Sequence, residues 1–243
     1  MKEFKIWLKY TSNSFQQTLA NWPTASILLV GKAIRVVLFL VFLGFLFRGT
    51  NGIAGYSRTQ IIFFYLSFNL TDTLAQLFYR EVYRFRQLVV SGTLDYVLVK
   101  PINPLIRVLM GGGDVLDLVM LCLLTAITIV FAIQNLTITL GNLTLYLALI
   151  ANGFLIATAF HILVLGIGVM TTSVDHMVMI YRDMTSMMRI PVDLYIEPIR
   201  FMLTFILPLG IMITFPAKAF LGLLSWQLIL LSLGFGITSF FLS

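Results

Sequence analysis

Residues 80–107, REVYRFRQLVVSGTLDYVLVKPINPLIR, interrupt a chain that is otherwise almost continuously apolar. This charged segment carries five of the sixteen basic residues of the protein, a Ser-Gly-Thr turn and two prolines. The apolar runs on both sides of it are long enough to cross a hydrocarbon core of about 30 Å. The charged segment is therefore predicted to connect two membrane spans, and its length and structure indicate that a partner docks there.

The composition supports an integral membrane protein. Hydrophobic residues make up 59% of the chain and charged residues only 11%, whereas about 25% of the residues of a typical soluble domain are charged. A soluble fold of this composition would expose large apolar patches, which monomeric proteins avoid. We therefore expect residues 1–243 to form one transmembrane domain, and the modest net charge of +6 gives no reason to expect a nucleic-acid partner.

Apolar runs of roughly 20 residues predict an all-α, polytopic membrane fold with six transmembrane helices. The expected spans are residues 25–47, 58–79, 105–133, 143–172, 196–214 and 220–242. Pro208 is expected to kink the fifth span, because proline removes a backbone donor. Pro216 is expected to make a short break before the sixth. Backbone between Pro208 and Gly222 must be shielded by protein or lie near the membrane surface.

The first 24 residues have the pattern of an amphipathic helix that lies on the membrane interface. Lys5 and Lys9 alternate with the apolar Phe4, Trp7 and Leu8, which is typical of helices that bind anionic headgroups. A frayed tail is the alternative.

The distribution of basic residues predicts the orientation. With the N-terminus in the cytoplasm, the cytoplasmic segments hold Lys2, Lys5, Lys9, Arg80, Arg84, Arg86, Lys100, Arg107, Arg182 and Arg189. The external loops hold only Arg48, Arg58 and Lys218. This positive-inside bias puts both termini, the charged segment and a second polar loop at residues 173–195 in the cytoplasm.

Polar residues inside the predicted spans are candidates for a translocation path, because they are costly in hydrocarbon and normally face a bundle interior. They are Asp72, Asp114, Asp117 and His161. Asp114 and Asp117 are three residues apart, which places them on one helix face, and a structural role near the headgroups is the alternative for this pair. We interpret His161 as a hydrogen-bonded packing residue rather than a proton relay.

Within the charged segment, Glu81 and Arg84 have the spacing of an intrahelical ion pair. Gly92 is expected to end this helix, since glycine tolerates left-handed backbone. Residues 94–99 are apolar apart from one acid and would face water in a free loop, which favours packing against a partner over a solvated loop. Pro101 and Pro104 end this stretch.

The sequence gives an enzymatic function little support. A Walker pattern is not formed around Gly31-Lys32, because Ser26 occupies the position of the first glycine and Ala33 replaces the required Ser or Thr. With two histidines and the single Cys122, we expect no metal site.

The chain resembles the membrane subunits of type 2 ABC transporters, and within them the small six-span bacterial subfamily that accompanies daunorubicin-resistance-type ATPases. Arg86, the string SGTLD at residues 91–95 and LVKPINP at residues 98–104 carry the resemblance. Pro208-Leu-Gly and Phe215-Pro-Ala are a second match. The resemblance covers nearly the whole chain.

This resemblance implies a permease subunit of an exporter in the bacterial cytoplasmic membrane, with no nucleotide site of its own. ATP and Mg²⁺ would bind a separate ABC ATPase dimer, and a second permease copy, identical or a sister subunit, would complete the path among membrane lipids. The charged segment would supply coupling helices that fit the ATPase, and the loop at 173–195 a smaller contact. The implied coupling residues are Arg84, Arg86, Ser91, Gly92, Thr93, Leu94, Asp95, Leu98, Lys100 and Pro101. The run Gly111-Gly112-Gly113 departs from the pattern and suggests a flexible hinge that would weaken coupling.

The second hypothesis is an ATP-independent secondary transporter or channel that uses Asp72 and the pair Asp114 and Asp117 for cation or proton coupling. Secondary transporters often contain inverted repeats with broken helices at corresponding positions. No convincing repeat relates the two halves of this chain.

Overall fold

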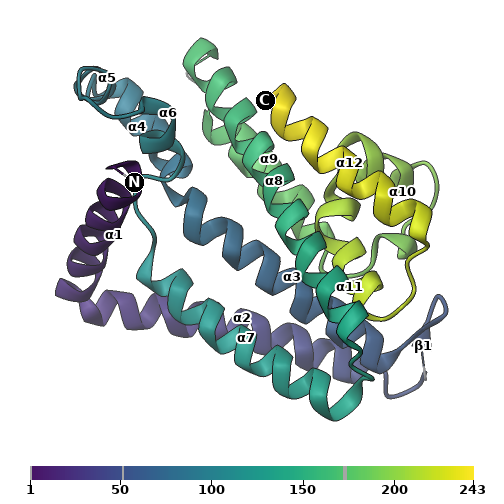
Figure 1. Cartoon of the computed structure of the whole chain (residues 1–243). Helices are drawn as coiled ribbons and strands as arrows, with labels where there is room; N and C mark the ends of the chain where they lie inside the picture. Colours follow the sequence, from purple (N-terminus) through teal and green to yellow (C-terminus); the bar gives the residue numbers. More distant parts are fainter. Residues whose placement is uncertain (1, 51, 172–173) are drawn as a thin grey trace.

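The computed structural model describes residues 2–50, 52–171 and 174–243, and it is almost entirely helical (Figure 1). Four helices are long and apolar enough to cross a membrane: α2 (Trp22–Leu46), α3 (Arg58–Tyr79, which continues to Val90), α7 (Val115–Asn135) and α8 (Leu140–Thr171). A bent helix pair near the C-terminus raises the count to five if it is one span. The all-α membrane architecture is confirmed, and the count of six spans is not.

The bundle has two recognisable ends (Figure 1). The charged end carries the segment after α3, together with α1 (Lys2–Ala20) and the C-terminus. The hairpin end carries the two short strands β1 (Gly52–Ile53) and β2 (Tyr56–Ser57), which pair antiparallel. The positive φ of Gly55, at 84°, makes the tight turn between these strands possible.

Helix α1 meets α2 at a sharp corner (Figure 1), with Asn21 between them and Pro23 in the first turn of α2. Proline is favoured there because the first helical N–H groups have no intrahelical partner. The helix expected over residues 1–24 thus ends at Ala20. Of the four long helices, α2 is the least covered, with 11% of its most apolar stretch buried.

Helix α3 is the central element of the bundle, with 67% of its most apolar stretch buried. Ser57 and Gln60 form a capping box that fixes its start. Its aromatic side chains build the core at both ends: Phe63 stacks on Phe220 at 4.7 Å, and Tyr79 stacks on Phe154 at 5.2 Å. The large apolar residues of α3 therefore hold α7, α8 and the C-terminal helices around it.

The charged segment folds into short helices rather than one loop. A 3₁₀ helix, η1 (Arg80–Arg84), follows α3 directly and leads into α4 (Phe85–Val90), α5 (Leu94–Leu98) and α6 (Pro104–Leu109). Helix α6 ends before the glycine run, so the third span begins at Val115 and not near Leu105 as expected. Asn103 and Asp114 cap α6 and α7 with their side-chain oxygens.

The polar stretch expected as a loop at residues 173–195 is helical over much of its described length. Ser173 lies outside the described residues, and α9 (Val174–Met187) packs along α8 in the opposite direction. The stretch ends at η2 (Val192–Leu194), where the carboxylate of Asp193 accepts hydrogen bonds from Tyr56 at 2.7 Å and from Lys218 at 3.0 Å. Because Tyr56 belongs to the hairpin end, residues 174–193 connect the two ends of the bundle.

The fifth expected span, residues 196–214, is instead the first part of a broken helix pair. Helices α10 (Ile199–Phe201) and η3 (Met202–Ile206) form one arm, and η4 (Gly210–Thr214) with α11 (Phe215–Phe220) forms the other, bent by 77°. Pro208 stands in the gap between the arms. Pro216, expected at a break, lies instead in the first turn of α11, where a missing N–H is tolerated.

The second arm is buried except at the half-buried Lys218, which satisfies the requirement that irregular backbone be shielded by protein. It packs so closely on α8 that a Cβ added to Gly153 would come within 2.6 Å of the Met212 carbonyl oxygen. Helix α12 (Trp226–Leu242) then returns along α8, tied to it by the Asn152 amide, which donates to the Ser232 carbonyl at 2.8 Å.

Candidate functional site

The charged segment presents exposed apolar side chains at its end of the bundle. Val90, Tyr96, Leu98 and Val99 are exposed by 71%, 70%, 54% and 80%. Val97, between them, is buried and anchors the segment to the bundle. We call the four exposed side chains the docking patch. A monomeric soluble surface rarely gathers large apolar residues in this way, so the patch is typical of a protein contact.

The turn before the docking patch is fixed by local hydrogen bonds. Gly92 has a φ of 72°, the left-handed conformation expected of it. Ser91 donates from its hydroxyl to the Gln87 carbonyl at 2.6 Å, and Thr93 donates to the Leu88 carbonyl at 3.4 Å. These bonds satisfy carbonyls at the end of α4 and hold α5 at a defined angle.

The residues that the resemblance assigned to coupling surround the docking patch. Arg84 lies 3.7 Å from Glu81, as its spacing predicted, and Leu94 is half-buried. Arg86 Nη1 donates to Asp175 Oδ2 at 2.9 Å, which links α4 to the start of α9. The remaining members are exposed: Ser91, Gly92, Thr93, Asp95, Leu98, Lys100 and Pro101.

The glycine run is a packing site for α1. Gly113 donates its N–H to the Thr11 hydroxyl at 3.1 Å, and a Cβ on Gly112 would lie 3.2 Å from the Tyr10 carbonyl oxygen. The guanidinium of Arg107 lies 4.2 Å above the Tyr10 ring and bonds Glu81 at 3.2 Å. The small residues thus allow α1 to approach the backbone. The glycine run is therefore a packing site for α1, which we call its seat, in place of the flexible hinge that the sequence suggested.

Asp114 and Asp117 belong to an ion network inside the bundle. Asp117, 1% exposed, pairs with Lys32 of α2 and with Arg80, whose Nη1 lies 3.3 Å from its Oδ2. Arg80 also lies 3.3 Å from Asp114. This network joins α2, η1 and α7 at one level. The two carboxylates already have positive partners, which favours a structural role for the pair.

Asp72 lies in a different environment, a groove of about 770 Å³ between α2, α3 and α9. Its carboxylate accepts a hydrogen bond from Gln76 at 2.7 Å. The groove lining consists of Gly31, Ile34, Arg35, Leu38, Phe39, Phe42, Tyr65, Phe68, Asn69, Asp72, Gln76, Met179, Arg182, Asp183, Ser186 and Arg189. Its size is typical of small-molecule sites. It is the best-formed candidate for a translocation path among the described residues.

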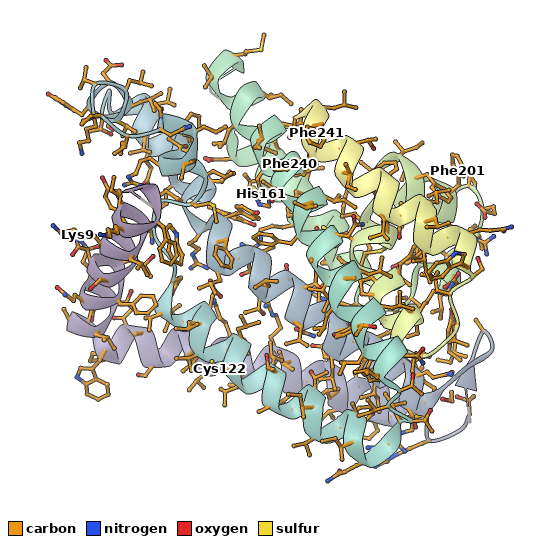
Figure 2. All side chains as sticks on the ribbon, viewed as in Figure 1. Lys9, Cys122, His161, Phe201, Phe240 and Phe241 are labelled. Carbon is orange, nitrogen blue, oxygen red and sulfur yellow. The ribbon has the colours of Figure 1, made fainter. Side chains whose placement is uncertain are left out.

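His161 lies in the middle of the bundle (Figure 2), 2% exposed. Its Nδ1–H donates to the Ala157 carbonyl at 2.7 Å, and its ring stacks on Tyr79 and meets the edge of Tyr181. These contacts are compatible with the interpretation of His161 as a hydrogen-bonded packing residue, which stays a prediction.

The hairpin end holds a second polar cluster that sequence reasoning missed, centred on Asp193. Burial and then the hydrogen bond to the Asp193 carboxylate raise the pKa of the Tyr56 phenol. Arg182 and Arg189 of the groove were assigned only as orientation signals, and Arg35 was given no role in a site. Arg35 and Arg182 lie close in the sequence to the apolar Phe39 and Met179, and this was the only signal in the sequence that they face the bundle interior. The sequence does not show which helices pack against each other.

The profile of a family described as "ABC-2 family transporter protein" matches residues 33–243. No curated protein and no solved structure matches the chain. Proteins of this family are membrane components that are not themselves catalytic, and they typically work with an ATPase partner.

Proposed function

Because the chain belongs to the ABC-2 family of transporter proteins, we propose that it is the permease subunit of an ATP-driven exporter of the bacterial cytoplasmic membrane. Two permease copies, identical or paired with a sister subunit, enclose the substrate path. A separate ABC ATPase dimer of the daunorubicin-resistance type binds ATP and Mg²⁺. The termini and the charged segment face the cytoplasm, where the ATPase docks.

The docking patch carries this proposal. Tyr96, Leu98 and Val99 stand in water if nothing covers them, because they lie on short helices beyond the spans. An interface with a central aromatic and aliphatic cluster and a polar rim provides both affinity and specificity. The basic residues Arg84, Arg86 and Lys100 supply that rim.

The proposed orientation of the protein in the membrane follows from the distribution of its basic residues. The charged end holds Lys5, Lys9, Arg80, Arg84, Arg86, Lys100 and Arg107, and the hairpin end holds Arg48, Arg58, Arg200 and Lys218. The excess of basic residues at the charged end supports a cytoplasmic position for it. Lys5 and Lys9 of α1 then face the anionic headgroups of the inner leaflet.

A physical connection leads from the docking patch to the groove. The ion pair of Arg86 with Asp175 ties α4 to the first turn of α9, and α9 supplies the groove residues Arg182 and Asp183. A rigid-body movement of α4 on the ATPase would pull on α9 and change the width of the groove. This connection supports ATP-driven coupling, whereas the pairing of Asp114 and Asp117 with cations removes two of the three carboxylates on which a secondary transporter would depend.

The test is a triple variant, Tyr96→Ser, Leu98→Ser and Val99→Ser, co-expressed with its ABC ATPase. We expect ATPase co-purification to fall at least tenfold, since loss of interface anchors costs about 2 kcal/mol or more. The matched control, Leu140→Ser and Ile196→Ser, changes residues that are exposed by 78% and 74% but lie outside the charged segment. The proposal fails if the triple variant still co-purifies the ATPase and still exports substrate.

A further inference from the structure

The groove between α2, α3 and α9 contains three arginines and an aromatic wall. Arg35 comes from α2, Arg182 from α9, and Arg189 follows the end of α9. Phe39 and Tyr65 stack at 4.4 Å and line the same groove. A site with positive charge beside apolar and aromatic surface has the chemistry of an amphiphile site.

The arginines are not neutralised by ion pairs within the described residues. The other basic residue in the middle of α2 is Lys32, and it pairs with Asp117. Arg35, Arg182 and Arg189 have no carboxylate within ion-pair distance in the described part of the chain. An arginine at membrane depth without a partner is costly and normally marks a ligand pathway.

The three charges are distributed along the groove. Arg182 lies over the Tyr83 ring at 5.7 Å, near the charged end, and Arg189 lies over Phe39 at 5.9 Å, further toward the hairpin end. Arg35 precedes Phe39 by four residues on α2, so it lies on the same helix face one turn away. An anion that moves along the groove from the charged end toward the hairpin end is therefore close to a guanidinium group throughout.

The acidic residues of the groove do not cancel this charge. Asp72 and Asp183 are its two carboxylates, against three guanidinium groups, which leaves one positive charge in excess. Arg35 and Arg182 both lie within electrostatic range of Asp72, which is hydrogen-bonded to Gln76. Asp72 therefore attracts both guanidinium groups but forms an ion pair with neither, and their N–H donors stay available to a ligand.

We propose that this groove binds amphiphiles with an anionic head, a carboxylate or a phosphate, and an aliphatic or aromatic body. The guanidinium fork matches the oxygens of either head in a bidentate manner, and the aromatic wall receives the body. This substrate class rests on the proposed permease function, which makes the groove part of the exported path. The anion itself comes either from a transported molecule or from an anionic membrane lipid.

The test uses the full chain in nanodiscs of neutral lipid and a fluorescent probe, cis-parinaric acid, whose methyl ester has the same tail without the charge. We expect the acid to bind at least tenfold more tightly than the ester, and Arg35→Gln with Arg182→Gln to abolish this preference, because the uncharged ester and the glutamine side chains cannot form charge-assisted hydrogen bonds between guanidinium and carboxylate. The Arg35→Lys and Arg182→Lys pair should retain part of the preference. Arg200→Gln, which changes an arginine paired with Glu197 outside the groove, should leave it intact.

The proposal is overturned if the acid and the ester bind equally, or if the glutamine variants keep the preference. Competition by phosphatidylglycerol in the nanodisc assigns the site to lipid headgroups, and ATP-dependent uptake of the acid into everted vesicles assigns it to transported cargo; either outcome supports an anion site. Binding needs no ATPase. Loss of uptake with intact selective binding therefore counts against the permease function alone, while absence of selective binding counts against the anion site alone.

Discussion

At the scale of single residues, the ion network of Lys32, Arg80, Asp114 and Asp117 explains why charges are tolerated between α2 and α7. Each of the two carboxylates has a cation within 3.3 Å, and Asp117 is shielded from solvent. A buried ion pair contributes little compared with an apolar pair of the same volume, but removal of one partner leaves an uncompensated charge. The network therefore fixes which helix faces meet.

Asp117→Asn should destabilise the fold by about 3 kcal/mol, because it leaves Lys32 without its partner at membrane depth. The double variant Lys32→Met and Asp117→Leu should recover most of this loss, since Arg80 retains Asp114. The measurement is the thermal unfolding midpoint in detergent. Equal stability of Asp117→Asn and the unmodified protein would contradict the network.

The glycine run makes a second prediction at this scale. Gly112→Val should displace α1, because a larger side chain there meets the Tyr10 backbone. Trp7 stacks on Phe78 at 5.8 Å, so with Trp22 and Trp226 replaced by Phe its fluorescence reports whether α1 is seated. We expect greater quenching by acrylamide in Gly112→Val. Gly141→Val is the control, since no neighbouring atom lies within 4 Å of its added Cβ. Identical quenching in both variants would contradict the packing of α1 on the glycine run.

At the scale of elements, the broken pair of α10–η3 and η4–α11 is the part of the fold that departs most from the expected spans. Its second arm is held against α8 at Gly153 and closed at the hairpin end by Asp193 and Lys218. The bend, the close packing on α8 and the ion pair at the hairpin end distinguish this pair from a straight membrane-spanning helix.

Gly153→Val should therefore lower the unfolding midpoint markedly, since the added side chain would overlap the Met212 carbonyl and overpacking costs about 1–3 kcal/mol or more. Gly166→Val is the matched control on the same helix, because the space around Gly166 is open. Both substitutions replace a glycine of α8 by valine and so restrict the backbone in the same way. The two variants therefore differ in the space around the added side chain. If their midpoints change by the same amount, the close contact between α8 and η4 is not important.

The sequence predicted elements better than their contacts. The predicted bounds of α3 agree with the structure, in which Ser57 caps its start and Arg80 begins the charged segment. The stretch after Ser173 was misread as a loop, because Asp175, Arg182, Asp183 and Arg189 look like solvated residues when their neighbours in space are unknown. Their groove and ion-pair partners lie on α2, α3 and α4, which are distant in the sequence. Arg86 and Asp175 are 89 residues apart, and the groove residues of α2 are more distant still. Periodicity in the sequence indicates which residues share a helix face, but only the folded structure shows which elements pack against that face.

At the scale of the whole molecule, α2 is the element that most needs a partner. Val41 and Phe45 are exposed by 48% and 57% on one face of α2, and Ile34, exposed by 51%, borders the groove beside Arg35. Lipid can cover the aliphatic residues but not the guanidinium. A second permease copy on this face would shield Arg35 and close the groove.

In a Cys122→Ser background, Val41→Cys should form a disulfide-linked dimer in native membranes after mild oxidation. The reason is that two copies related by a twofold axis bring the same position of α2 together. The unmodified protein is the control, because Cys122 of α7 is exposed (Figure 2). Stronger cross-linking through Cys122 than through Val41→Cys would move the dimer contact away from α2.

The seat of α1 also sets an order of assembly during synthesis. Thr11 leaves the ribosome 102 residues before Gly113, its hydrogen-bond partner, and Lys32 leaves 85 residues before Asp117. Until α7 has emerged, the N-terminal helix has no seat and a lysine of the first span has no counter-charge. The nascent chain must therefore hold α1 and α2 in a provisional position, and their final placement marks the moment at which α7 enters the membrane.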